Sequence, residues 1–160
     1  MVTIYAVLML DLLFRFGFIL YSEPQAGQNY NLIPFRTIWT YLSPKIPYME
    51  AVRNLLGNIA AFIPFGLYLQ ALRGKKRIWT SFLIVLVTSA LVEILQFSFN
   101  VGTFDIDDVL LNGIGGLLGI LLYHFLRKVT KDEDKTKTVI TVLSLLFGIP
   151  CLSILLSGRF

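Results

Sequence analysis

Long apolar runs are the feature that most restricts how this chain can fold. Hydrophobic residues make up 56% of its 160 residues and charged residues only 15%, and the mean hydropathy is +0.72. A helix of about 20 apolar residues crosses a bilayer core of about 30 Å. We therefore predict an all-α integral membrane protein, a single domain over residues 1–160 built as a bundle of about five transmembrane helices, at residues 2–21, 54–72, 78–99, 107–126 and 138–156.

Lysine and arginine are distributed unequally between the predicted loops. Nine lie in segments 73–77 and 127–137, against four on the other side of the membrane. Because these residues are retained in the cytoplasm more often than they are exported, we expect the N-terminus inside and the C-terminus outside. This topology accounts for the net charge of +4, and no basic stretch has the pattern of a nucleic-acid-binding module. We expect membrane lipids, and no nucleic acid, as partners.

The loop between the first two predicted spans is expected outside and is rich in aromatic residues and proline. Pro34 favours the start of a short helix and Pro44 its end. Between them, apolar residues recur at helical spacing on one face, at Phe35, Ile38, Trp39 and Leu42. We predict an interfacial or re-entrant helix here; the alternative is an irregular loop with interfacial aromatics.

Polar residues recur at helical spacing inside three apolar spans. Each set lies on one helix face, and the sets are Asn54 and Asn58, then Glu93, Gln96 and Asn100, then Asp105, Asp108 and Asn112. In the predicted topology all three sets lie near the outer surface and reach roughly 10 Å into the membrane. Ionisable groups in lipid are costly unless they pair or face water. We therefore predict that the three faces converge on an acidic pocket open to the outside.

Three interpretations of this polar group remain open. The amides and carboxylates could join the helices through hydrogen bonds and do nothing more. Asp105, Asp107 and Asp108 offer the oxygen ligands that calcium or magnesium prefers, which makes a divalent cation an alternative. Glu93, removed from water and near other acids, is suited to act as a general acid, a general base or a proton carrier.

Two further features border the predicted pocket. Arg53 precedes Asn54 and could bind an anionic headgroup or a carboxylate, or could extend to the surface. Gly115 and Gly119 have the GxxxG spacing that permits close helix contact, and they leave formation of a homodimer open. The helix that carries the aspartates and these glycines is therefore expected to be central to the bundle.

These residues lie in segments that resemble the VanZ-like family of bacterial membrane proteins, which is named for a teicoplanin-resistance protein. The matching segments, in order, are "NLIPF" at 31–35, "NLLGNIAAFIPFGLYL" at 54–69, "EILQ" at 93–96 and "GTFDIDDVLLNGIGGLLG" at 102–119. The resemblance covers nearly all of residues 1–126. It implies a bacterial cell membrane protein with a role in low-level teicoplanin resistance, associated with less antibiotic binding at the cell. It singles out Asn54, Asn58, Glu93, Gln96, Asp105, Asp108 and Asn112.

The pocket and the resemblance together favour a binding protein of the cell envelope. Its pocket would take a polar or cationic group of a lipid-linked or lipid-tailed molecule, such as a lipoglycopeptide, while Trp39 contacts the acyl part. The expected ligand-binding residues are Asn54, Asn58, Glu93, Gln96, Asp105, Asp108, Asn112, Arg53 and Trp39. The alternative is a membrane enzyme that modifies a lipid headgroup or cell-wall precursor, with Glu93 and Asp108 catalytic and Asp105 and Asp108 holding a metal. Its weakness is that no nucleophile is evident.

Overall fold

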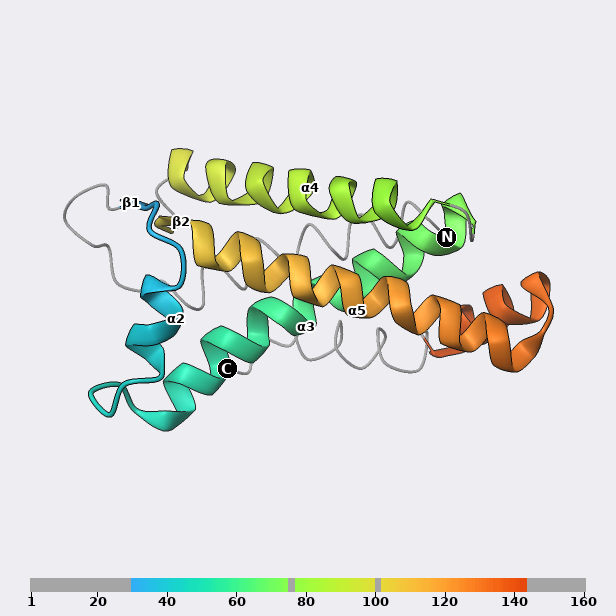
Figure 1. Cartoon of the computed structure of the whole chain (residues 1–160), viewed down its shortest axis with the longest axis horizontal. Helices are drawn as coiled ribbons and strands as arrows, with labels where there is room; N and C mark the ends of the chain where they lie inside the picture. The colour runs from blue at the N-terminus through green and yellow to red at the C-terminus, as the bar shows by residue number, and fades with distance from the viewer. Residues whose placement is uncertain (1–29, 75–76, 100–101, 144–160) are drawn as a thin grey trace, which may run out of the picture.

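The structure, a computed structural model, describes residues 30–74, 77–99 and 102–143, and most of these residues are helical. Three helices are long and apolar enough to cross a membrane. They are α3 (Tyr48–Arg73), α4 (Ile78–Ser98) and α5 (Ile106–Thr130). Helices α4 and α5 run roughly along the long axis of the molecule, and α3 crosses them obliquely (Figure 1). The prediction of an all-α membrane protein is therefore confirmed.

Three short elements, one helix and two strands, lie at one end of this bundle. Helix α2 (Arg36–Tyr41) forms between Pro34 and Pro44, as the prolines predict. Strands β1 (Tyr30–Asn31) and β2 (Phe104–Asp105) pair in parallel, with Asn31 opposite Asp105. We call this end of the molecule the α2 end; the other is the opposite end (Figure 1).

The predicted spans at 54–72, 78–99 and 107–126 correspond to α3, α4 and α5. Helix α3 begins earlier, at Tyr48, because its first turn continues over polar residues that an apolar run does not include. Helix α5 continues to Thr130, and Arg127 and Lys128 in its last turn suit the negative end of the helix dipole. The predicted span at 2–21 lies outside the described residues. Of the span at 138–156 only 138–143 are described, and these are helical.

Helices α3 and α5 approach so closely that backbone meets backbone. A Cβ atom on Gly115 would stand 2.0 Å from the carbonyl oxygen of Ile59, and one on Gly119 would stand 2.0 Å from that of Ile63. Such distances leave room for hydrogen only, so the GxxxG spacing makes the close helix contact that it predicts. The contact lies within one chain. A homodimer formed through this glycine face would require α3 to leave it.

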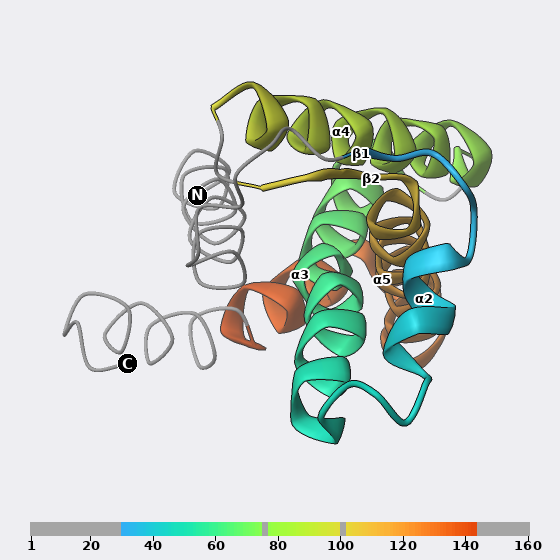
Figure 2. The ribbon, with the colours of Figure 1, turned by 90° about the vertical axis from the view of Figure 1, so that its left-hand side faces the viewer.

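Helix α4 packs on α5 beside this crossing. A Cβ atom on Gly116 would meet the side chain of Val85, which is fully buried. Half of the apolar window of α5 is buried, compared with 33% for α3 and 22% for α4. Figure 2 views the bundle from the α2 end and shows α5 beside α3, with α4 above them. Helix α5 is therefore the central element, as expected.

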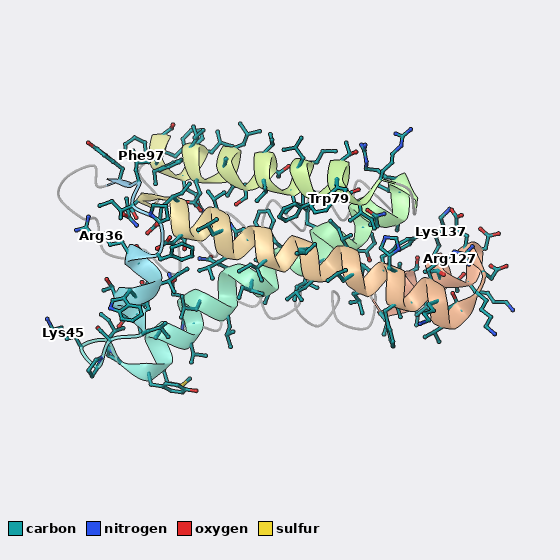
Figure 3. The ribbon with its side chains drawn as sticks, viewed as in Figure 1. Arg36, Lys45, Trp79, Phe97, Arg127 and Lys137 are labelled. Carbon is teal, nitrogen blue, oxygen red and sulfur yellow. The ribbon has the colours of Figure 1, made fainter. Side chains whose placement is uncertain are left out.

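The two ends of the bundle carry different groups of residues. The start of α3, the end of α4 and the start of α5 lie at the α2 end, so their polar faces are at one level. Arg36 and Lys45 are at this end, whereas Arg127 and Lys137 are at the opposite end (Figure 3). The placement of the α2 end outside the cell remains a prediction from the lysine and arginine counts.

The close crossing predicts that Gly119→Ala destabilises the protein. The added methyl group overlaps the backbone of α3 and forces the helices apart, at a cost of about 1–3 kcal/mol. Reversible denaturant unfolding in detergent measures this loss. Leu118→Ala is the matched control, because Leu118 is 45% exposed on the same helix. Equal stability of the two variants would contradict the crossing.

Candidate functional site at the α2 end

The first turn of α5 concentrates carboxylates at a helix start. Asp105 is the N-cap residue, and its side chain accepts a hydrogen bond of 2.8 Å from the Asp107 backbone N–H. Asp107 and Asp108 follow within the first turn. Free N–H groups and the positive end of the helix dipole favour negative charge at this position. The segment "DIDD" thus places three carboxylates where the helix itself stabilises them.

Asp107 holds α2 through the backbone. Its Oδ1 accepts from the Phe35 N–H, and its Oδ2 accepts from the N–H groups of Thr37 at 2.7 Å and Ile38 at 3.2 Å. These donors belong to the first turn of α2, which has no side-chain cap of its own. Asp107 therefore caps a helix about 70 residues away in sequence. Its side chain is fully buried, and both of its oxygens are occupied.

Asp105 holds the segment that precedes α2. Its Oδ1 accepts a bond of 3.0 Å from the Asn31 side-chain amide, and its Oδ2 accepts from the Thr37 hydroxyl. Asn31 also donates to the Thr37 hydroxyl at 3.0 Å. The β1–β2 pairing brings Asn31 to this position. We call Asp105 and Asp107 the α2 clamp.

Phe35 shows that the clamp supports strained backbone. Its φ of 66° lies in the left-handed region, which bulky side chains rarely adopt. Such a residue costs on the order of 1–3 kcal/mol and persists where its surroundings hold it. Here the Phe35 N–H is fixed by Asp107. The turn into α2 therefore depends on the Asp107 carboxylate.

A second layer of polar contacts joins the three long helices. Asn58 on α3 donates to Asp108 on α5. Asn112 on α5 donates to the Ser89 hydroxyl on α4 at 2.9 Å. One face of α5 thus bonds to both neighbours, as the helical spacing predicts. Some of the predicted pocket residues therefore form hydrogen bonds between helices.

Glu93 and Asn54 are poorly hydrogen-bonded members of this layer among the described residues. It is 4% exposed, and the hydrogen bond found for it among the described residues is a long one, 3.4 Å, from the Asp105 backbone N–H. Asn54 is 3% exposed, and its Oδ1 has no partner within the described part of the chain. The Glu93 Oε2 atom and the Asn54 Oδ1 atom are both hydrogen-bond acceptors here. The buried layer therefore holds more acceptor capacity than the described donors fill.

Tyr41 brings a phenol from α2 towards the same carboxylates. Its side chain is half-buried. Burial raises the pKa of the Tyr41 hydroxyl, and the negative charges of Asp108, Glu50 and Asp105 raise it further. The phenol therefore stays protonated at neutral pH and keeps a proton to donate.

The structure brings together most of the predicted site residues. Hydrogen bonds connect Asn58, Glu93, Asp105, Asp108 and Asn112 to the polar layers, and Asn54 and Gln96 are buried on the same helix faces. Arg53 and Trp39 are exposed and lie outside this group, and Asn100 is outside the described residues. Sequence reasoning missed Asn31, Thr37 and Ser89 as members and the clamp role of Asp107. The segment "NLIPF" was the available signal for Asn31, since it lies in the matching motifs.

The donor set does not suit the predicted divalent cation. Both oxygens of Asp105 already accept hydrogen bonds from protein groups, and so do both oxygens of Asp107. Within the described ranges no group of three or more histidine, cysteine, aspartate or glutamate residues is arranged to hold a metal ion. Asp105 and Asp108 therefore gain no support as a metal site, and the enzyme that would depend on one gains none either.

The clamp predicts that Asp107→Asn releases α2. An amide offers one acceptor oxygen in place of two and lacks the charge, and each charge-assisted hydrogen bond lost costs about 1.5–3 kcal/mol. Amide hydrogen exchange at Phe35, Thr37 and Ile38 should accelerate by about tenfold or more.

Asp132→Asn is the matched control. Asp132 accepts a backbone bond of 2.9 Å from Lys135 at an exposed helix start near the opposite end. Its loss should leave exchange in α2 unchanged. If both variants, or neither, accelerated exchange in α2, the clamp would not be what holds this helix.

Comparison with known proteins agrees with this architecture. Protein VanZ of Enterococcus faecium is 38% identical over 90 residues, which are 56% of this chain and 56% of that protein. The aligned part thus spans about half the length of this relative. No solved structure matches the chain. A family model described as VanZ/LLP1 matches residues 2–127, which include both the clamp and the second polar layer, and the chain belongs to this family.

Proposed function

We propose that the protein contributes to glycopeptide resistance from the bacterial cell membrane, and that it does so by binding a lipid-linked or lipid-tailed envelope molecule at the buried polar layer of α3, α4 and α5. Membership of the VanZ/LLP1 family and the likeness to Protein VanZ support the first part. The burial and the long hydrogen bond of Glu93 support the second part, the binding of a ligand.

Glu93 is the observation that carries the binding proposal. A carboxylate inside an apolar membrane helix costs several kcal/mol unless it is paired or reaches water. The long bond from Asp105 offsets little of that cost. A ligand with several N–H donors, such as a protonated amine, would supply the hydrogen-bond donors that Glu93 and the Asn54 Oδ1 lack among the described residues. The site therefore favours a cationic, donor-rich headgroup.

The carboxylates divide into two groups by their partners. Asp105 and Asp107 are occupied by the backbone and side chains that precede and begin α2. Glu93 and Asp108 lie beyond the clamp, towards the middle of the bundle, on the faces of α4 and α5. Because this layer is near the α2 end, a molecule whose tail stays in the outer leaflet could reach it with its headgroup. That geometry suits a lipid-tailed ligand.

Interhelical hydrogen bonding alone accounts for only part of the layer. The Asn58–Asp108 and Asn112–Ser89 bonds join helices and need no ligand. A glutamine at position 93 could accept the same bond from Asp105 without the cost of a buried charge. The presence of a carboxylate there is therefore what the binding proposal explains.

The test is the susceptibility of a sensitive bacterial host to teicoplanin and vancomycin. The host expresses wild type, Glu93→Gln or Asp108→Asn, and membrane abundance is compared by blot. Wild type should protect against teicoplanin, and both variants should return to the level of the empty host, because they remove charge and keep shape. Glu50→Gln is the matched control, since Glu50 is an exposed carboxylate at the same end; it should protect like wild type.

Two results would count against the proposal. A wild-type protein present at normal abundance that gives no protection would remove the resistance role. Full protection by both variants would show that the buried charges are structural. Binding of labelled teicoplanin to purified protein in nanodiscs then separates direct recognition from an indirect effect.

A further inference from the structure

Helix α2 exposes large apolar side chains and turns two polar side chains towards the site. Thr37 and Tyr41, one turn apart, face the carboxylates of the site. Phe35, Trp39 and Leu42 are 64%, 77% and 65% exposed. In a water-soluble protein the apolar stripe of such a helix faces the core. Here Thr37, Ile38 and Tyr41 are partly buried, whereas the large apolar side chains of Phe35, Trp39 and Leu42 are exposed.

The exposed apolar face extends beyond α2. Leu32 and Ile33, in the segment leading into the helix, are 60% and 59% exposed, and Tyr48 and Met49 at the start of α3 are also exposed. An apolar surface of this extent marks an interaction site in a folded protein. We call Leu32, Ile33, Phe35, Trp39 and Leu42 the α2 surface. Exposed apolar side chains also occur along α3, which is a predicted membrane span.

The clamp fixes the depth of the α2 surface. The N–H groups of Thr37 and Ile38 bond to Asp107 in the first turn of α5. Helix α5 has 25 residues, which at about 1.5 Å per residue gives roughly 37 Å, more than the core of about 30 Å. Its first turn therefore lies at the headgroup level. A helix tied to that turn lies along the interface and does not re-enter the membrane.

Positive charge borders the α2 surface. Arg36 and Lys45 are exposed and project at the α2 end (Figure 3). Exposed cations beside tryptophan and other large apolar side chains are the pattern of segments seated at a phospholipid interface. A second copy of the chain would gain nothing from these cations, because the same face on the partner carries the same charges.

We propose that the α2 surface is a membrane-docking surface whose partner is the phospholipid bilayer. Phe35, Trp39 and Leu42 enter the boundary between headgroups and acyl chains, and Arg36 and Lys45 meet the phosphates. This docking on the bilayer does not depend on the function proposed above. Through the clamp it also sets the level of the carboxylates with respect to the same leaflet.

Tryptophan fluorescence tests the proposal directly, because the chain has two tryptophans and Trp79→Phe leaves Trp39 alone. The variant is reconstituted in phosphatidylcholine vesicles that are brominated either near the carbonyl end or near the methyl end of the acyl chain. Trp39 emission should be quenched more by the first lipid than by the second. Aqueous iodide should quench it less than it quenches free tryptophan.

An inward-facing control establishes which side of α2 meets the lipid. Tyr41→Trp, made with Trp39→Phe and Trp79→Phe, places the only tryptophan on the polar face and should be quenched less by either bromolipid. Strong iodide quenching of Trp39 without bromolipid quenching would overturn the proposal in favour of an aqueous loop. Stronger quenching by the deep bromolipid would indicate re-entry. Emission that responds to the protein-to-lipid ratio and to neither bromolipid would indicate a second copy.

Discussion

The carboxylates at the start of α5 are the interaction on which the α2 end depends. A buried carboxylate needs donors, and Asp107 finds three in the first turn of α2. Helix α2 in turn has no cap of its own, and Phe35 is held in left-handed backbone. Asp107 supplies the cap that α2 lacks, and α2 supplies the donors that the buried Asp107 needs. The cost of burying charge and the cost of strained backbone are therefore offset by the same set of hydrogen bonds.

The glycine crossing gives this end a rigid base. Contact between the backbones of α3 and α5 at Gly115 and Gly119 leaves little freedom for sliding. Hydrogen bonds between polar side chains lie at either end of the crossing. Asn58 donates to Asp108 near the α2 end, and Gln70 approaches His124 at 3.3 Å near the opposite end. A register fixed in this way keeps the polar faces of α3 and α5 level with each other.

The polar layer was predictable because it follows from local rules. A helical period places Asn54 with Asn58, and Asp108 with Asn112, and the apolar runs indicate which helix ends share a level. The orientation of α2 was not predictable in the same way. Its donors are satisfied by a carboxylate about 70 residues away, and no local pattern indicates that partner. The same distant contact brings in Asn31 and Thr37. Trp39 is exposed, and its expected contact with the acyl part of a ligand stays a prediction.

The difference between satisfied and poorly satisfied carboxylates bears on how such a site could discriminate between ligands. Asp105 and Asp107 have both oxygens bonded, so a ligand would have to displace protein donors to reach them. Among the described residues Glu93 accepts one long hydrogen bond, and it is buried in surroundings of low dielectric constant, where a charge interacts strongly with an opposite charge. Under the binding proposal, a cationic group gains most where it meets an ionised Glu93 in such surroundings, and an anionic group gains nothing there. The clamp thus holds the start of α5 and the segment around α2 together, and Glu93 is the residue to which the binding proposal assigns the preference for positive charge.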